Sequence, residues 1–135
     1  TQRGSIIVYS QGFEKSIICR LRDLFPDLAD ELNSFVERLI DLEVPFSQKH
    51  VYTKELQGRS SIKKVLPALC KGDPELDYSA LNNVHNGSDA MNAFASLSSK
   101  SEEEVNLIRK DLLAYCRLDT LAMVKILERL YDLAK

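Results

Sequence analysis

A run of apolar residues at helical spacing limits the fold of the last third of the chain. The run extends from Glu102 to about Ala134, which is long for a helix of a globular protein. Ser101 and the three glutamates that follow it form a capping-box pattern, so the helix should begin there. We expect one long amphipathic helix with a break or kink near its middle.

Shorter patterns in the rest of the chain predict a little strand among further helices. Residues 5–9 form a β-branched run that meets a turn at residues 10–12, as expected of a buried strand. Residues 39–42 fit either the end of a helix or a short strand. Helical spacing predicts helices over residues 13–25, 28–39, 62–69 and 89–97. The expected fold class is helix-rich α/β, in a single domain over residues 1–135.

Size and composition limit the class of protein. A chain of 135 residues suits one domain that needs no disulfide or metal for stability. Hydrophobic residues at 44% and charged residues at 28% are globular values, and no apolar run approaches the roughly 20 residues that cross a bilayer, so no membrane partner is expected. The formal net charge of −2 argues against electrostatic binding of nucleic acid by the whole surface, but it is compatible with a local basic patch.

The cysteines and the start of the chain bear on its cellular setting. Cys19, Cys70 and Cys116 lie far apart, each in an apolar stretch, which indicates buried free thiols in a reducing compartment. No signal peptide precedes the first strand, so a cytoplasmic location is expected. The first residue is Thr1 and not methionine, which suggests a piece excised from a longer protein.

One candidate site lies in the long C-terminal helix. Tyr115 and Asp119 are four residues apart and therefore share one helix face. A carboxylate in apolar surroundings requires a cation or a hydrogen-bond donor, and the tyrosine hydroxyl could position a water on a metal ion that Asp119 holds. The alternative is an ordinary pair on a helix surface, which is the more common case.

A second candidate lies where the first strand turns into a helix. Glu14 opens that helix, and backbone amides at strand-to-helix turns of α/β layers often gather ligands. The alternative is that Glu14 is there because the helix dipole favours an acid in the first turn.

Taken together and in this order, the two segments resemble the second and third motifs of the DEDD-type 3′–5′ exonucleases, the DnaQ-like branch of the RNase H-like superfamily. Residues 8–14 match its strand and Phe-acid turn, and residues 115–119 match the Tyr-x-x-x-Asp of the tyrosine subclass. Nearly the whole chain is similar to an uncharacterised bacterial family with a RecB-like nuclease region upstream, through residues 5–16, 61–69 and 115–124.

The resemblance implies a metal-dependent nuclease that acts on DNA or RNA ends. Two Mg²⁺ or Mn²⁺ ions about 4 Å apart would activate a water and stabilise the leaving oxygen. Glu14 and Asp119 would be two of the four metal-binding acids, and Tyr115 would orient the attacking water. Ser61, Lys63 and Lys64 would meet a substrate phosphate, although lysines on a helix are more often simply solvated.

Two departures from the exonuclease pattern change what the chain can do. Nothing like the Asp-x-Glu of the first motif precedes Ser5, and Glu14 stands where the superfamily generally has Asp. The expected fold is therefore a partial RNase H-like exonuclease domain whose opening strands are missing from this chain, inactive alone and completed by an upstream segment of the same protein. An uncovered sheet edge or apolar face would also favour self-association.

Other interpretations stay open. The chain could be a non-catalytic helical binding or regulatory module of a larger nuclease, or an unrelated helical interaction domain if Glu14 and Asp119 lie far apart. The segment 39–42, which contains Asp41, resembles an Ile-Asp strand near the active site of related nucleases. A capping or turn role for such an aspartate is the more common one. His85 and Asp89 are one residue short of the spacing used by the histidine subclass.

Overall fold

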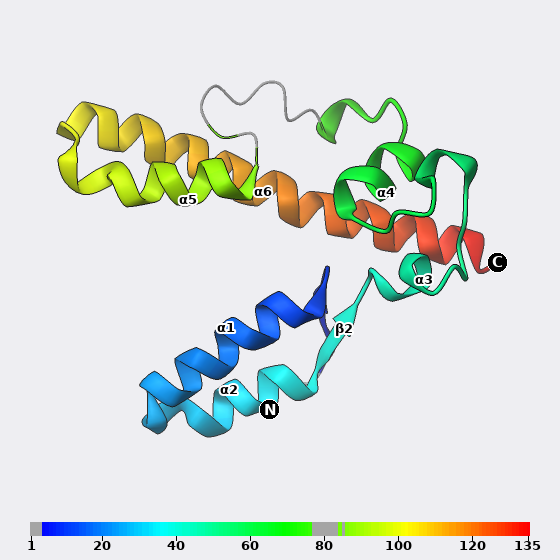
Figure 1. Ribbon diagram of the computed structural model, residues 1–135, viewed down its shortest axis with the longest axis horizontal. Coiled ribbons are helices and arrows are strands. Elements are labelled where there is room, and N and C mark those ends of the chain that lie inside the picture. Colours follow the sequence, from blue (N-terminus) through cyan, green and yellow to red (C-terminus); the bar gives the residue numbers. More distant parts are fainter. Residues whose placement is uncertain (1–3, 77–83, 85) are drawn as a thin grey trace. The chain divides into compact units, whose positions relative to one another are not determined.

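The computed structural model describes residues 4–76, 84 and 86–135 (Figure 1). Its residue contacts group into two compact units, residues 1–71 with 126–135 and residues 72–125. Helices predominate, and two short strands form a parallel sheet, so the expected helix-rich α/β class is confirmed. The RNase H-like identity of the fold and the single domain over residues 1–135 stay predictions.

The first unit opens with a strand–helix–helix–strand segment. Strand β1 (Ile6–Val8) leads into α1 (Gln11–Leu24), the one-turn 3-10 helix η1 (Pro26–Leu28), α2 (Ala29–Glu37) and β2 (Leu39–Asp41). The ambiguous stretch after α2 is therefore a strand, while the first strand and both helices are as predicted. β1 and β2 pair in parallel with Ile6 opposite Leu39 and Val8 opposite Asp41. This register brings the carboxyl ends of both strands to the same edge.

The α1–α2 hairpin is a thin layer. The two helices pack side by side in Figure 1. Every residue of both helices is described by the structure, and none of them is buried. One face of α1 instead leaves four apolar side chains exposed at helical spacing: Phe13, Ile17, Leu21 and Leu24. The hairpin therefore buries one side of its apolar surface and presents the other.

The rest of the first unit supplies its core. The chain passes through α3 (Val44–Ser47), η2 (Lys54–Leu56) and α4 (Ile62–Leu69), and the last turns of the C-terminal helix belong to the same unit. Leu56 is 1% exposed, and Val65 and Ile126 are fully inaccessible. Other buried apolar residues of this unit are Val8, Tyr9, Leu42, Phe46, Leu66 and Cys70. α4 has the bounds that the apolar spacing predicts.

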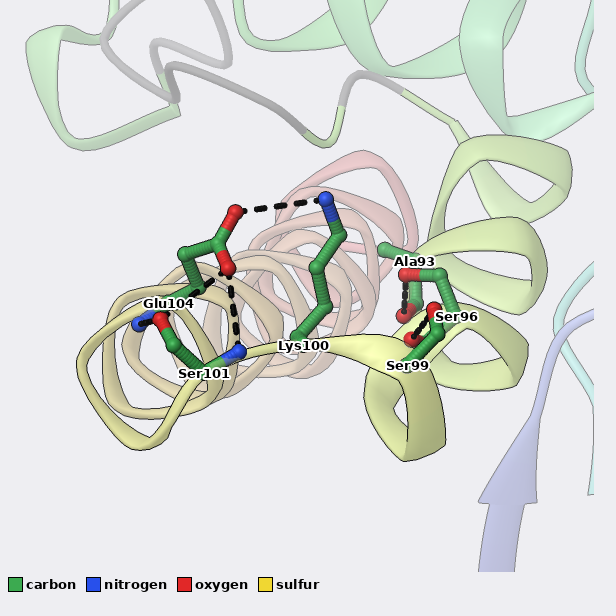
Figure 2. Close-up of polar contacts among 6 residues, drawn as sticks. All are labelled: Ala93, Ser96, Ser99, Lys100, Ser101 and Glu104. Atoms are coloured by element: carbon green, nitrogen blue, oxygen red, sulfur yellow. Dashed lines mark hydrogen bonds and ion pairs between the residues drawn. The ribbon is translucent and has the colours of Figure 1, made fainter.

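The second unit consists of η3 (Pro74–Leu76), α5 (Gly87–Ser96), η5 (Leu97–Ser99) and most of α6 (Glu102–Leu133). The predicted capping box at the start of α6 is confirmed (Figure 2). The Ser101 backbone N–H and hydroxyl each donate to Glu104 Oε2 at 3.0 Å, and the Glu104 N–H reaches the Ser101 hydroxyl at 3.4 Å. Lys100 adds an ion pair with Glu104 at 3.3 Å. Local side chains thus fix where α6 begins.

α6 is continuous, so the expected break near its middle is wrong. Its 32 residues contain neither proline nor glycine, and the one residue with a competing hydroxyl near the centre, Thr120, bonds back to the Cys116 carbonyl at 3.0 Å without interrupting the helix. Lys125 pairs with Asp73 at 3.2 Å and with Glu75 at 2.8 Å, which ties the segment around η3 to the helix.

The cysteines are free thiols, but the expectation that all of them are buried is wrong. Cys70 is buried, Cys19 is half-buried and Cys116 is exposed on α6. The difference arises because Cys116 lies on a side of α6 that faces solvent. Within the described ranges, no helix is long and apolar enough to cross a membrane.

Candidate functional site

The turn between β1 and α1 is held from a distant part of the chain. Asp41, at the end of β2, accepts three backbone N–H groups with its carboxylate. Oδ1 accepts from Ser10 at 2.9 Å and from Glu43 at 2.8 Å, and Oδ2 accepts from Gln11 at 2.8 Å. Ser10 and Gln11 are the first residues of the helix start, whose N–H groups have no partner within the helix. Asp41 therefore caps α1, and the capping role expected as the common one is confirmed.

The backbone at this turn is constrained. Ser10 has φ 65° and ψ 62°, the left-handed region that residues other than glycine rarely adopt, and its own side chain makes no capping hydrogen bond. A serine before a helix ordinarily caps it through its hydroxyl. Here the parallel pairing of β1 with β2 delivers the Asp41 carboxylate to the same N–H groups, so the cap comes from 31 residues away.

A second polar network ties the ends of both strands to the loop before α4. The Tyr9 hydroxyl donates to the Ser60 carbonyl, and the Ser60 hydroxyl donates to Glu43 Oε1 at 2.7 Å. Burial, followed by the negative charges of Glu43 and Asp41, raises the pKa of the Tyr9 phenol well above its usual range. Tyr9 is therefore a neutral donor at physiological pH, as the network requires.

Glu14 lies in the first turn of α1. It directly follows the turn between β1 and α1 that Asp41 holds, which we call the clamped turn. Its side chain is half-buried, and its Oε2 atom is buried without a hydrogen-bond partner. Burial raises the pKa of the Glu14 carboxyl above its usual value and the charge of Asp41 raises it further, while a hydrogen bond from its own backbone N–H acts in the opposite direction. Burial and the charge of Asp41 thus disfavour the ionised form of Glu14.

Tyr115 and Asp119 form the pair that their spacing predicts. Both are half-buried on one face of α6 and are joined by a side-chain hydrogen bond. Burial, the charge of Asp119 and this hydrogen bond raise the pKa of Tyr115 to about 12, and the charge of Asp89 on α5 contributes as well. Asp89 is itself held at the start of α5, where its N–H donates to the Asn86 side chain at 3.0 Å. The Tyr115 hydroxyl is a neutral donor beside two carboxylates.

The predicted phosphate-binding residues lie at the start of α4. Ser61 is the N-cap residue and is exposed, Lys63 is exposed, and Lys64 is half-buried. The same helix buries Val65 and Leu66. His85, the other part of the alternative pair with Asp89, lies outside the described residues.

The structure thus gathers the predicted residues in two places. Glu14 lies with Asp41 in the first unit, and Tyr115 lies with Asp119 and Asp89 in the second. Over residues 4–76, 84 and 86–135, no three His, Cys, Asp or Glu side chains form a group that could hold a metal ion. A shared Mg²⁺ or Mn²⁺ site between Glu14 and Asp119 stays a prediction.

Sequence reasoning missed three polar residues of the clamped turn. Tyr9, Glu43 and Ser60 gave no signal, because a tyrosine at a strand end and a serine in a loop are common everywhere. Asp41 did give one, because an aspartate side chain often accepts the backbone N–H two residues further on in an Asx-turn, as Asp41 does from Glu43.

Comparisons with known proteins lead to uncharacterised ones. The family model of a domain of unknown function, DUF2779, matches residues 1–61. An uncharacterized protein of Mycoplasma genitalium is 28% identical to the chain over 141 residues, which cover 97% of the chain and 21% of that protein. The chain therefore spans about a fifth of the length of this curated relative. No solved structure matches the chain. The similarity to an uncharacterised bacterial family agrees with the sequence analysis, and the exonuclease identity stays a prediction.

Proposed function

We propose that this chain carries half of the metal site of a DEDD-type 3′–5′ exonuclease that hydrolyses nucleic-acid ends. Glu14 and Asp119 bind the divalent cations, and Tyr115 orients the attacking water. The observation that carries the proposal is the buried Oε2 atom of Glu14, which has no hydrogen-bond partner and lies one helical turn after backbone N–H groups that Asp41 holds.

The state of Glu14 favours a cation over a proton donor. The carboxyl sits in the field of Asp41, so an arriving cation is attracted by two negative charges. Mg²⁺ and Mn²⁺ prefer carboxylate oxygen and bind through one or two carboxylates together with substrate phosphate. A group that destabilises the fold by its own ionisation is more typical of a functional site than of a structural one.

The pair on α6 supports the roles of Asp119 and Tyr115. A metal-binding carboxylate is commonly hydrogen-bonded by a neighbour that fixes its orientation, and the Tyr115 hydroxyl is such a neighbour. The high pKa of Tyr115, about 12, keeps the phenol neutral, and because its one proton is donated to Asp119, the phenol oxygen would orient the water by accepting a hydrogen bond from it.

The reaction would be hydrolysis of the terminal phosphodiester. The water oxygen bonds to phosphorus, and the bond from phosphorus to the 3′ oxygen of the next nucleotide breaks. A proton from the water ends on that 3′ oxygen, so the shortened strand ends in a 3′ hydroxyl. When bound, the cations supply charge stabilisation and a more acidic water. Lys63 and Lys64, with Ser61, would contact a phosphate of the strand.

The two remaining acids of the site are proposed to lie on a segment outside residues 1–135. The Mycoplasma relative is long enough to hold such a segment, since the chain aligns with 21% of it. The proposal keeps the expected cytoplasmic setting, which suits the three free thiols.

Metal binding by the 135-residue chain is the first test. Mn²⁺ added to the ¹⁵N-labelled chain should broaden the amide signals of residues 12–15 and of residues 115–120 at the same concentrations, and Mg²⁺ should compete. Glu14→Gln and Asp119→Asn should each abolish both effects. Glu31→Gln and Glu128→Gln, which neutralise exposed acids on α2 and α6, should leave them unchanged. Broadening confined to the acidic run 102–104 would contradict the proposal.

The stability of the metal-free chain gives an independent readout for Glu14. The pKa of the Glu14 carboxyl is raised in the folded state. Its favourable contribution to the free energy of unfolding is therefore complete at a pH below the pKa of the unfolded chain, and it is lost as the pH rises through the pKa of the folded chain. At pH 7 the ionised carboxylate therefore destabilises the fold, and Glu14→Gln should raise the melting temperature there and not at pH 4. A lower melting temperature at pH 7 would show that Glu14 is a structural acid.

Activity is tested in the full-length protein that carries the chain. With 5′-labelled DNA and RNA strands and Mn²⁺, the wild type should shorten the strand from its 3′ end. Glu14→Gln and Asp119→Asn should abolish the reaction, while Tyr115→Phe should lower it about 100-fold or more, as expected for loss of a group that positions the nucleophile. Full activity in Asp119→Asn would refute the proposal.

The alternative function, a non-catalytic binding module, is favoured by one observation. The exposed apolar face of α1, with Phe13 68% and Leu24 70% exposed, suits docking of another polypeptide. In that case the full-length protein would shorten no strand, and Phe13→Ser would weaken its association with a partner while Asp119→Asn would not.

A further inference from the structure

The Asp41 carboxylate is almost fully used by the backbone. An ionised carboxylate offers about four lone-pair directions, and three of them accept the N–H groups of Ser10, Gln11 and Glu43 at 2.8–2.9 Å. A carboxylate occupied in this way is a poor metal ligand, because binding a cation would require it to release at least one of these donors. Its position at the turn must therefore serve another purpose.

That purpose follows from the residues it holds. Ser10 and Gln11 form the start of α1, and Glu14 projects from the first turn of that helix. The left-handed conformation of Ser10 is unfavourable for a serine and would relax if nothing held it. By binding both N–H groups, Asp41 fixes the start of α1 against the end of β2, and thereby fixes the backbone that carries Glu14.

The other end of the same clamp is also fixed. The Oδ1 atom that holds Ser10 holds the N–H of Glu43 as well, and Glu43 in turn accepts the Ser60 hydroxyl at 2.7 Å. The backbone of the turn is therefore held by Asp41 on one side and by the Glu43–Ser60 hydrogen bond on the other. A metal-binding carboxylate gains affinity when its backbone is held in the binding geometry before the ion arrives.

We propose that Asp41 is a positioning residue, which holds the β1–α1 turn so that the Glu14 carboxylate is preorganised for a divalent cation while Asp41 itself makes no bond to the ion. The inference rests on the proposed function of Glu14. It predicts a graded response to substitution that neither a direct ligand nor a purely structural cap would give.

Mn²⁺ affinity of the ¹⁵N-labelled chain, read from the broadening at residues 12–15, provides the test. Asp41→Ala removes all three acceptors and should weaken Mn²⁺ binding about tenfold or more, as loss of an outer-shell partner does. Asp41→Asn keeps one acceptor oxygen and should weaken it clearly less. Val36→Ala, which shortens a half-buried side chain of α2, should leave the affinity unchanged under conditions where every variant is folded. Equal and complete loss in Asp41→Asn and Asp41→Ala would show a direct ligand and overturn the inference.

Hydrogen exchange in the metal-free chain separates this inference from the proposed function. The Gln11 amide, bonded to Oδ2, should exchange faster in both Asp41 variants, and the Ser10 and Glu43 amides faster in Asp41→Ala. Suppose that these amides exchange faster in the Asp41 variants but the wild type binds no Mn²⁺ at residues 12–15. Both the proposed function and the positioning role then fail, and Asp41 is a structural cap only. If Mn²⁺ binds with equal affinity in wild type and Asp41→Ala, only the positioning role fails.

Discussion

The Tyr115 phenol should remain protonated far above the pH at which ordinary tyrosines ionise. Burial and the neighbouring Asp119 carboxylate raise its pKa to about 12. At pH 11 about a tenth of Tyr115 should therefore be ionised, compared with about nine tenths of an unperturbed tyrosine of pKa about 10. A pH titration of ¹³Cζ-labelled tyrosine by NMR measures this directly, with Tyr115→Phe used to assign the signal.

Substitution of Asp119 shows how much of the effect comes from the pair. Asp119→Asn removes the negative charge and keeps the shape, so the pKa of Tyr115 should fall toward 10 but stay above it, because burial is the larger cause. Glu128→Gln, which neutralises an exposed acid on the same helix, is the matched control and should leave the titration unchanged.

The same shift should appear in stability. A phenol whose folded pKa is raised contributes stability in full below about pH 10 and loses it as the pH rises toward 12. Tyr115 is only half-buried, so solvent screening reduces its contribution to about 1 kcal/mol. The free energy of unfolding should fall over this range by about that much more in the wild type than in Tyr115→Phe. A wild-type pKa near 10, or a titration that Asp119→Asn does not change, would refute the Tyr115–Asp119 pair.

Three further predictions concern single positions. Leu56→Ala should lower the free energy of unfolding by about 3 kcal/mol in urea, because the side chain is 1% exposed and its removal leaves a cavity; a loss below about 1 kcal/mol would contradict this packing. Ser10→Gly should raise the urea midpoint slightly, and Ser10→Val should lower the free energy of unfolding by about 1–2 kcal/mol, because φ is 65°; equal midpoints would show that the turn is not left-handed. Ser101→Ala should speed hydrogen exchange over residues 101–104 and nowhere else, because it removes the capping hydroxyl of α6.

Local signals in the sequence predicted most of the secondary structure. The β-branched run before residue 10 forms β1, and the apolar spacing predicted both ends of α4 correctly. The capping box at Ser101 works because both of its partners lie within one helical turn. The expected break in α6 failed because length alone does not end a helix when no proline or glycine interrupts it.

Long-range contacts explain what could not be predicted. Within the ambiguous stretch 39–42, residues 39–41 form a strand because β1 pairs with them, and no sequence window around those residues reveals that partner. For the same reason Ser10 resembles a helix cap in sequence, while the real cap is Asp41, 31 residues further along the chain. The spacing of Tyr115 and Asp119 placed them on one helix face, but the buried oxygen of Glu14 depends on tertiary packing and was not foreseeable.

A crystal structure of the chain soaked in Mn²⁺ tests the central claim most directly. The measured quantity is the distance between the Glu14 and Asp119 carboxylates, together with the anomalous signal of manganese. Because the two ions of such a site lie about 4 Å apart and share ligands, the carboxylates should lie within about 8 Å of each other, with manganese bound to Glu14. Carboxylates on opposite faces, with no manganese at Glu14, would contradict the exonuclease account.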